Sequence, residues 1–198
     1  MEQWIKPSLW HTDLPLTKGA TKHTPMPPIT PEGECAFHES GHAVACYRLF
    51  HRLDYVSIVA TNEFRGCMKG MDDDWYERAS GTPDAQIRAH TAKIATITLA
   101  GGAAVEKLYG TMRGVEMTLD IGAVRELLED VAETGEEMDR FIDRCWSQAR
   151  RLVRKEWEPI KAVAAALMER KTLSGEDVRR ILLQTAQKGV NRAENNRV

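Results

Sequence analysis

Apolar residues recur at helical spacing over most of the chain, and short β-branched runs interrupt this pattern early in the sequence. The first strong signal is Thr30-Pro31-Glu32, because threonine caps a helix, proline is tolerated at the first helical position, and an acidic side chain suits the helix dipole. This start predicts a helix to about His51. Its apolar positions cover most of the circumference, which predicts a helix buried in the core: Ala36, Phe37, Val44, Ala45, Leu49 and Phe50.

The chain after this helix carries strand signals. A β-branched run at residues 55–60, a turn at Asn62-Glu63 and a second run at residues 64–69 predict a β-hairpin or small sheet. Residues 71–81 combine acidic and aromatic side chains, and they predict a loop over the surface.

The rest of the chain predicts helices. Thr82-Pro83-Asp84 starts a long helix that ends at Gly110, and the small residues at 99–104 predict close contact with another helix. Further helices are predicted at residues 118–133, 134–157, 160–170 and 174–187, with a kink or break at Pro159. The predicted fold class is therefore mainly α with a small β-hairpin or sheet.

Length and composition fit one ordinary globular domain, with 198 residues of which 42% are hydrophobic and 28% charged. Five of the eight prolines lie in residues 1–30, so this stretch is predicted to be an extended arm. Its Trp4 and Trp10 favour docking on the domain or on a neighbour over a free tail. Residues 31–187 form the predicted domain, and residues 188–198 a polar tail.

Charge and hydropathy exclude several classes of protein. The net charge is −2 with basic and acidic residues interleaved, so no nucleic-acid-binding surface is predicted. No apolar run approaches the roughly 18 residues that span a bilayer, and the amino-terminal residues lack a secretion signal. The four cysteines are widely spaced, which predicts reduced thiols. We therefore expect a cytoplasmic protein without a membrane segment.

The candidate chemistry concentrates in His38-Glu39-Ser40-Gly41-His42. Residues four apart share one face of a helix, so the two imidazoles can bind one Zn²⁺ per chain while Glu39 serves as general base for water at the metal. Chance also produces such a five-residue pattern, but the capped, buried helix and the small Gly41 beside His42 favour a metal site. A catalytic zinc takes three protein ligands, and the residues alone leave three candidates for the third: Asp120, Glu106 and His90.

Other segments accompany this motif in a fixed order along about residues 31–186. They are Ala36-Phe37-His38-Glu39-Ser40-Gly41-His42-Ala43, Val56-Ser57-Ile58, Arg65-Gly66, residues 100–110, Leu119-Asp120-Ile121 and residues 164–177. Together they resemble the peptidase domain of the FtsH family of membrane-anchored, ATP-dependent zinc proteases. The resemblance implies a zincin-like metallopeptidase fold, with Zn²⁺ on His38, His42 and Asp120 and with Glu39 as the catalytic base.

The chain also departs from the family's pattern. Gly102 stands where the family has an arginine, and Val105 stands where it has its first glutamate. A contact behind the metal ligands from these positions is therefore lost unless Glu106 supplies it. The sequence contains no phosphate-binding Gly-x-x-x-x-Gly-Lys-Ser/Thr loop and no AAA+ ATPase module. We therefore expect the substrate to be a flexible or unfolded polypeptide, or to be prepared by a separate unfoldase.

Substrate binding is predicted at the second strand. If residues 64–69 form a sheet edge above the metal, an extended peptide can add to it by main-chain hydrogen bonds, in contact with Gly66, Cys67 and Met68. The alternative is an ordinary hairpin packed on the helix. The oligomeric state is left open, since hexamers of the family depend heavily on the ATPase module.

The sequence thus predicts a zinc metalloendopeptidase that hydrolyses peptide bonds of flexible polypeptides without an ATPase of its own. A first alternative is a binding or regulatory module that keeps the fold but has lost turnover. A second is a site-specific protease of a regulator.

Overall fold

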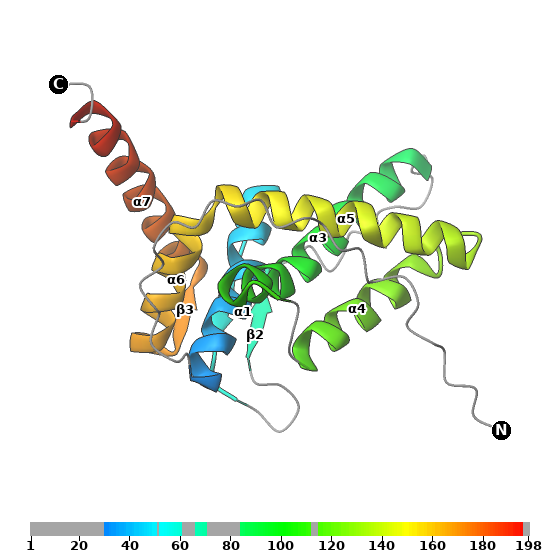
Figure 1. Cartoon of the computed structure of the whole chain (residues 1–198), viewed down its shortest axis with the longest axis horizontal. Helices are drawn as coiled ribbons and strands as arrows, with labels where there is room; N and C mark the ends of the chain where they lie inside the picture. The colour runs from blue at the N-terminus through cyan, green and yellow to red at the C-terminus, as the bar shows by residue number, and fades with distance from the viewer. Residues whose placement is uncertain (1–29, 51, 61–65, 71–83, 112–114, 196–198) are drawn as a thin grey trace.

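The structure is a computed structural model that describes residues 30–50, 52–60, 66–70, 84–111 and 115–195. In this part of the chain, six helices accompany one three-stranded sheet (Figure 1). The helices are α1 (Pro31–Phe50), α3 (Asp84–Tyr109), α4 (Val115–Leu128), α5 (Gly135–Lys155), α6 (Trp157–Arg170) and α7 (Gly175–Asn195), and the strands are β1 (Tyr55–Ser57), β2 (Cys67–Lys69) and β3 (Thr172–Ser174). The prediction of a mainly α fold with a small sheet is confirmed.

Helix α1 lies in the middle of the molecule, with α6 and α7 to one side and α4 to the other (Figure 1). Its start follows from the sequence, because the backbone N–H of Gly33 donates a 3.1 Å hydrogen bond to Oγ1 of Thr30. Ala43, Val44 and Ala45 have no exposed surface. The prediction of a capped, buried first helix is therefore confirmed.

Helices α1 and α3 pack backbone against backbone. A β-carbon at Gly41 would fall 2.4 Å from the carbonyl oxygen of Ala100, so a larger residue would force the helices apart. The close contact expected from the small residues at 99–104 is thus confirmed. Helix α3 ends as predicted at Gly110, whose φ of 78° lies in the left-handed region that glycine adopts most readily.

The sheet has the order β2-β1-β3, and both pairings are antiparallel. The predicted hairpin corresponds to β1 and β2, where Val56 lies opposite Met68. Strand β3 was not predicted, because it is three residues long and its Ser174 fits equally well as a helix cap. The turn at Asn62-Glu63, the loop at residues 71–81 and the arm at residues 1–29 lie outside the described residues.

Several helix boundaries differ from the predicted ones. Helix α4 begins at Val115 rather than Thr118 and ends at Leu128 rather than Glu133. The break after α5 falls at Glu156, so Pro159 lies in the first turn of α6, where the backbone N–H that proline lacks would have no partner within the helix. Helix α7 continues to Asn195, so the predicted polar tail is wrong for residues 188–195.

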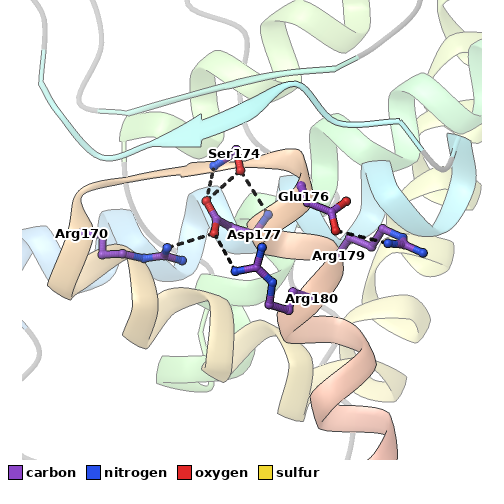
Figure 2. A network of polar contacts seen from close by, with 6 residues as sticks. All are labelled: Arg170, Ser174, Glu176, Asp177, Arg179 and Arg180. Atoms are coloured by element: carbon purple, nitrogen blue, oxygen red, sulfur yellow. Dashed lines mark hydrogen bonds and ion pairs between the residues drawn. The ribbon is translucent and has the colours of Figure 1, made fainter.

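A polar network fixes the junction between β3 and α7 (Figure 2). The backbone N–H of Asp177 donates to Oγ of Ser174 at 3.2 Å, while the Ser174 N–H donates to Oδ2 of Asp177 at 3.1 Å. Arg170 adds a 3.0 Å hydrogen bond to Oδ1 of the same carboxylate. Ser174 and Asp177 therefore form a reciprocal cap at the start of α7.

One hydrophobic core contains residues from all six described helices. Its largest completely or nearly completely buried side chains are Ile97, Leu99, Leu128, Ile160, Leu167, Leu173 and Leu182. Among the described residues, no helix combines the length and the apolar character that a membrane crossing requires.

Candidate metal centre

The predicted motif lies on α1 with its side chains directed into the core. His38, Glu39 and His42 are only 5%, 6% and 8% exposed. Because His38 and His42 are one helical turn apart, their rings meet edge to face, and their Nε2 atoms are 2.9 Å apart. The helix thus presents two imidazole nitrogens to one point.

Asp120 comes from α4 and faces the same point. Its Oδ2 lies 3.4 Å from Nε2 of His38 and 3.7 Å from Nε2 of His42, and its side chain is 16% exposed. His38, His42 and Asp120 together form a group that could hold a metal ion. The three residues are brought together across 82 positions of sequence by the contacts of α3 with both α1 and α4.

The spacing of these three atoms fits a four-coordinate ion. Zn–N and Zn–O bonds of about 2.0–2.2 Å at tetrahedral angles place two ligand atoms roughly 3.3–3.5 Å apart. The distances from Asp120 Oδ2 to His38 and His42 are 3.4 and 3.7 Å, whereas the two imidazole nitrogens, at 2.9 Å, must separate by a few tenths of an ångström. Two imidazoles and one carboxylate also suit other divalent transition metals, so the donors leave the identity of the ion open.

A main-chain carbonyl of α3 orients one of the imidazoles. Nδ1 of His42 lies 2.9 Å from the carbonyl oxygen of Ile97. If Nδ1 carries the proton and donates it to this oxygen, Nε2 is left with its lone pair directed at the metal position. Sequence reasoning missed Ile97, since a backbone contact leaves no mark on residue type.

Gly101 of α3 leaves space beside the imidazole nitrogens. A β-carbon at this position would fall 2.4 Å from Nε2 of His42 and 2.9 Å from Cε1 of His38. The backbone of α3 therefore forms one wall of the candidate site. Any side chain at position 101 would occupy the space between this wall and the imidazoles. The small residues at 99–104 predicted only a close contact between helices. Gly101 also lies beside the two candidate histidine ligands, which the sequence did not indicate.

Burial lowers the pKa of both histidines, whereas their charged neighbours lower the pKa of His38 and raise that of His42. The pKa of His38 is well below its ordinary value, because burial penalises its charged form and because His42 is close by. Burial also disfavours the charged form of His42, but Asp120, Glu39 and the Ile97 carbonyl together raise its pKa. The carboxylates of Glu39, which is buried, and Asp120, which is half-buried, thus create an environment that favours a cation beside His42.

Glu39 is held against the start of β2. A β-carbon at Gly66 would fall 2.7 Å from Cγ, 2.8 Å from Oε1 and 2.9 Å from Cδ of Glu39. The general base expected from the sequence thus lies beneath the strand expected to bind substrate. The side chains of Cys67 and Met68, which follow Gly66, lie on opposite faces of the sheet.

Strand β2 is at one end of the described sheet, so one of its edges is not paired with another described strand. Met68 packs against the hydrophobic core on the same face of the sheet as its partner Val56. Cys67 is half-buried and belongs to the opposite face, beside its partner Ser57. A role of Gly66, Cys67 and Met68 in substrate binding stays a prediction.

The other two candidate ligands lie elsewhere. Glu106 accepts two 2.7 Å hydrogen bonds from Nε and Nη2 of Arg150 on α5, and it does not belong to the His38, His42 and Asp120 group. A contact of Glu106 behind the metal ligands stays a prediction. The ring of His90 lies against the ring of Phe50, with centroids 5.1 Å apart.

Gly102, which stands where the FtsH pattern has an arginine, lies in a closely packed part of the protein. A β-carbon at Gly102 would fall 3.1 Å from Met117 and 3.2 Å from Trp146, so any larger residue there would require these side chains to shift. The sequence matches no protein-family model, and a search of curated proteins finds no relative. The resemblance to the FtsH peptidase domain thus remains a prediction that rests on the motifs.

Proposed function

We propose that this chain is a zinc-dependent metalloendopeptidase that hydrolyses peptide bonds of flexible or unfolded polypeptides. One observation carries the proposal: His38, His42 and Asp120 converge within metal-binding distance. Glu39 lies on α1, the helix that also carries both histidines. A general base adjacent to a two-histidine, one-carboxylate group is the arrangement that hydrolytic zinc sites use.

The chemistry divides between the ion and the protein. A bound Zn²⁺ would lower the pKa of water and polarise a peptide carbonyl. Glu39 would accept a proton from that water on a carboxylate oxygen and then deliver it to the leaving amine. Burial of Glu39 keeps bulk water from competing for this proton.

The edge of β2 that faces no other described strand supports an extended polypeptide as the substrate. A peptide that pairs with β2 would run past Gly66, which contacts Glu39. Pairing through the main chain requires an unfolded segment but little particular sequence, which supports a preference for flexible chains.

Two measurements test the proposal. Purified protein should contain about one zinc per chain and cleave casein, an unfolded substrate. Glu39→Gln should keep the zinc and lose cleavage, whereas His42→Ala should lose both. Cleavage that persists in Glu39→Gln would exclude Glu39 as the base. Full zinc occupancy without cleavage across a broad peptide library would instead support the binding or regulatory module, and a single defined product would support a site-specific protease.

A further inference from the structure

We infer that Gly66 is a positioning residue for Glu39: its missing side chain provides the space in which the carboxylate of the base is held. The inference rests on the proposed function for its catalytic meaning, and on geometry for the contact itself. Any β-carbon at position 66 would approach three atoms of the Glu39 side chain within 2.9 Å, which is closer than van der Waals contact allows.

The neighbouring structure prevents Gly66 from moving away. Cys67, the next residue, pairs with Ser57 of β1, and Ser57 in turn pairs with Thr172 of β3. The hydroxyl groups of Ser57 and Thr172 are 2.7 Å apart and join β1 to β3 a second time. A side chain at position 66 would therefore displace the carboxylate of Glu39 more readily than the strand.

The side chain of Glu39 has little other freedom. Glu39 is 6% exposed, and it belongs to the part of α1 that packs against α3, with Gly41 against Ala100 two residues later. A buried carboxylate displaced from one position has to find another rotamer in a closely packed region. Gly66 thus determines where the base lies, whereas Gly101 determines whether the imidazoles can reach a metal.

The binding of a small chelator can test this role without any peptide cleavage. Acetohydroxamate binds zinc and offers a hydrogen-bond donor to a carboxylate beside the metal, so its affinity reports the position of Glu39. We expect Gly66→Ala to keep zinc and to weaken acetohydroxamate binding by about tenfold, as loss of a hydrogen bond to a charged group does. Glu39→Gln should weaken it similarly, and the double variant should be no weaker than either single variant.

Gly70→Ala is the matched control. Gly70 follows β2 and is also closely packed, since a β-carbon there would fall 2.5 Å from Cα of Leu53, but its contacts are with the backbone of residues 52–54 and not with Glu39. This variant should lose thermal stability and keep the wild-type affinity for acetohydroxamate. If Gly70→Ala weakens the chelator as much as Gly66→Ala does, the effect is a general loss of structure and the inference is overturned.

A stability cycle tests the contact independently of metal and activity. Gly66→Ala should lower the melting temperature by about 2–10 °C, as overpacking in a chain of this size does. In a Glu39→Ala background the conflicting atoms are absent, so the same substitution should lower it far less, even if Gly66→Ala alone fails to fold. An equal loss in both backgrounds would overturn the inference. A protein that binds no zinc but shows this coupling would refute the proposed function and leave the contact established.

For active protein, the kinetic constants give a further readout. A displaced base should lower kcat and leave KM nearly unchanged, because the metal and the strand edge still bind substrate. Gly66→Ala that raises KM at constant kcat would contradict a role through Glu39 and would favour direct contact of position 66 with the peptide.

Discussion

Gly101 on α3 lies so close to His42 on α1 that a β-carbon at position 101 would fall 2.4 Å from the Nε2 atom of the imidazole. A zinc ion bound to this nitrogen would lie about 2.0–2.1 Å from it, so a side chain at position 101 would crowd the imidazole that has to bind the ion. The metal centre therefore depends on a residue that offers no ligand atom.

Gly101→Ala should weaken zinc binding by at least tenfold, because either the imidazole or α3 has to move before the ion can bind. Competition with a chromophoric chelator measures this affinity. Gly122→Ala on α4 is the control, since no atom lies within 4 Å of a β-carbon at that position, and it should bind zinc like the wild type. Unchanged zinc affinity in Gly101→Ala would show that the metal is not bound where we place it.

Asp120→Ala should lower the zinc affinity by more than the roughly 10–100-fold that loss of an outer contact costs, because it removes one of three ligands. Glu106→Gln provides the comparison. It removes the negative charge and one of the two acceptor oxygens that face Arg150, and it should reduce stability by about 1 kcal/mol while leaving the zinc affinity unchanged. The reverse pattern would assign the third ligand to Glu106.

The sequence predicted the candidate ligands of this site but not their surroundings. His38, Glu39 and His42 are recognisable because their spacing follows one helical turn, and Asp120 because a resemblance pointed to it. The Ile97 carbonyl and the spaces left by Gly66 and Gly101 depend on which backbones meet in three dimensions. A sequence pattern along one chain contains no record of such contacts.

The fold shows the same division between local and distant information. The helix starts at Thr30, Thr134 and Ser174 were predicted correctly, because a helix start uses residues that are neighbours in sequence. Strand β3 was missed because three residues carry no periodicity, and because its partner β1 lies more than 100 residues earlier. Its existence depends on α6 returning the chain to the sheet.

Gly175→Ala should destabilise the protein by about 3 kcal/mol or more, since a β-carbon there would fall 1.6 Å from the carbonyl oxygen of Leu53. The backbone N–H of Gly175 also donates a 2.9 Å hydrogen bond to the carbonyl of Asp54, so the junction cannot move away without losing it. Urea unfolding measures the change. Gly135→Ala, at a helix start with no atom within 4 Å of the added carbon, should be nearly neutral. Equal effects of the two substitutions would disprove this explanation.

Asp177→Asn should reduce stability at neutral pH but not in strong acid. The hydrogen bonds from Ser174 and Arg170 lower the pKa of Asp177 from 3.8 to about 2. Because the folded pKa is the lower one, the carboxylate contributes its full stabilisation above about pH 4, and the contribution is lost as the pH falls through about 2. The difference in unfolding free energy between wild type and Asp177→Asn should therefore shrink steadily between these two pH values. Glu176→Gln, which removes an exposed ion pair with Arg179 in the same network (Figure 2), is the control and should change stability little at neutral pH. A difference that stays constant from pH 6 to pH 2 would mean that Asp177 stabilises the junction through its shape and not through its charge.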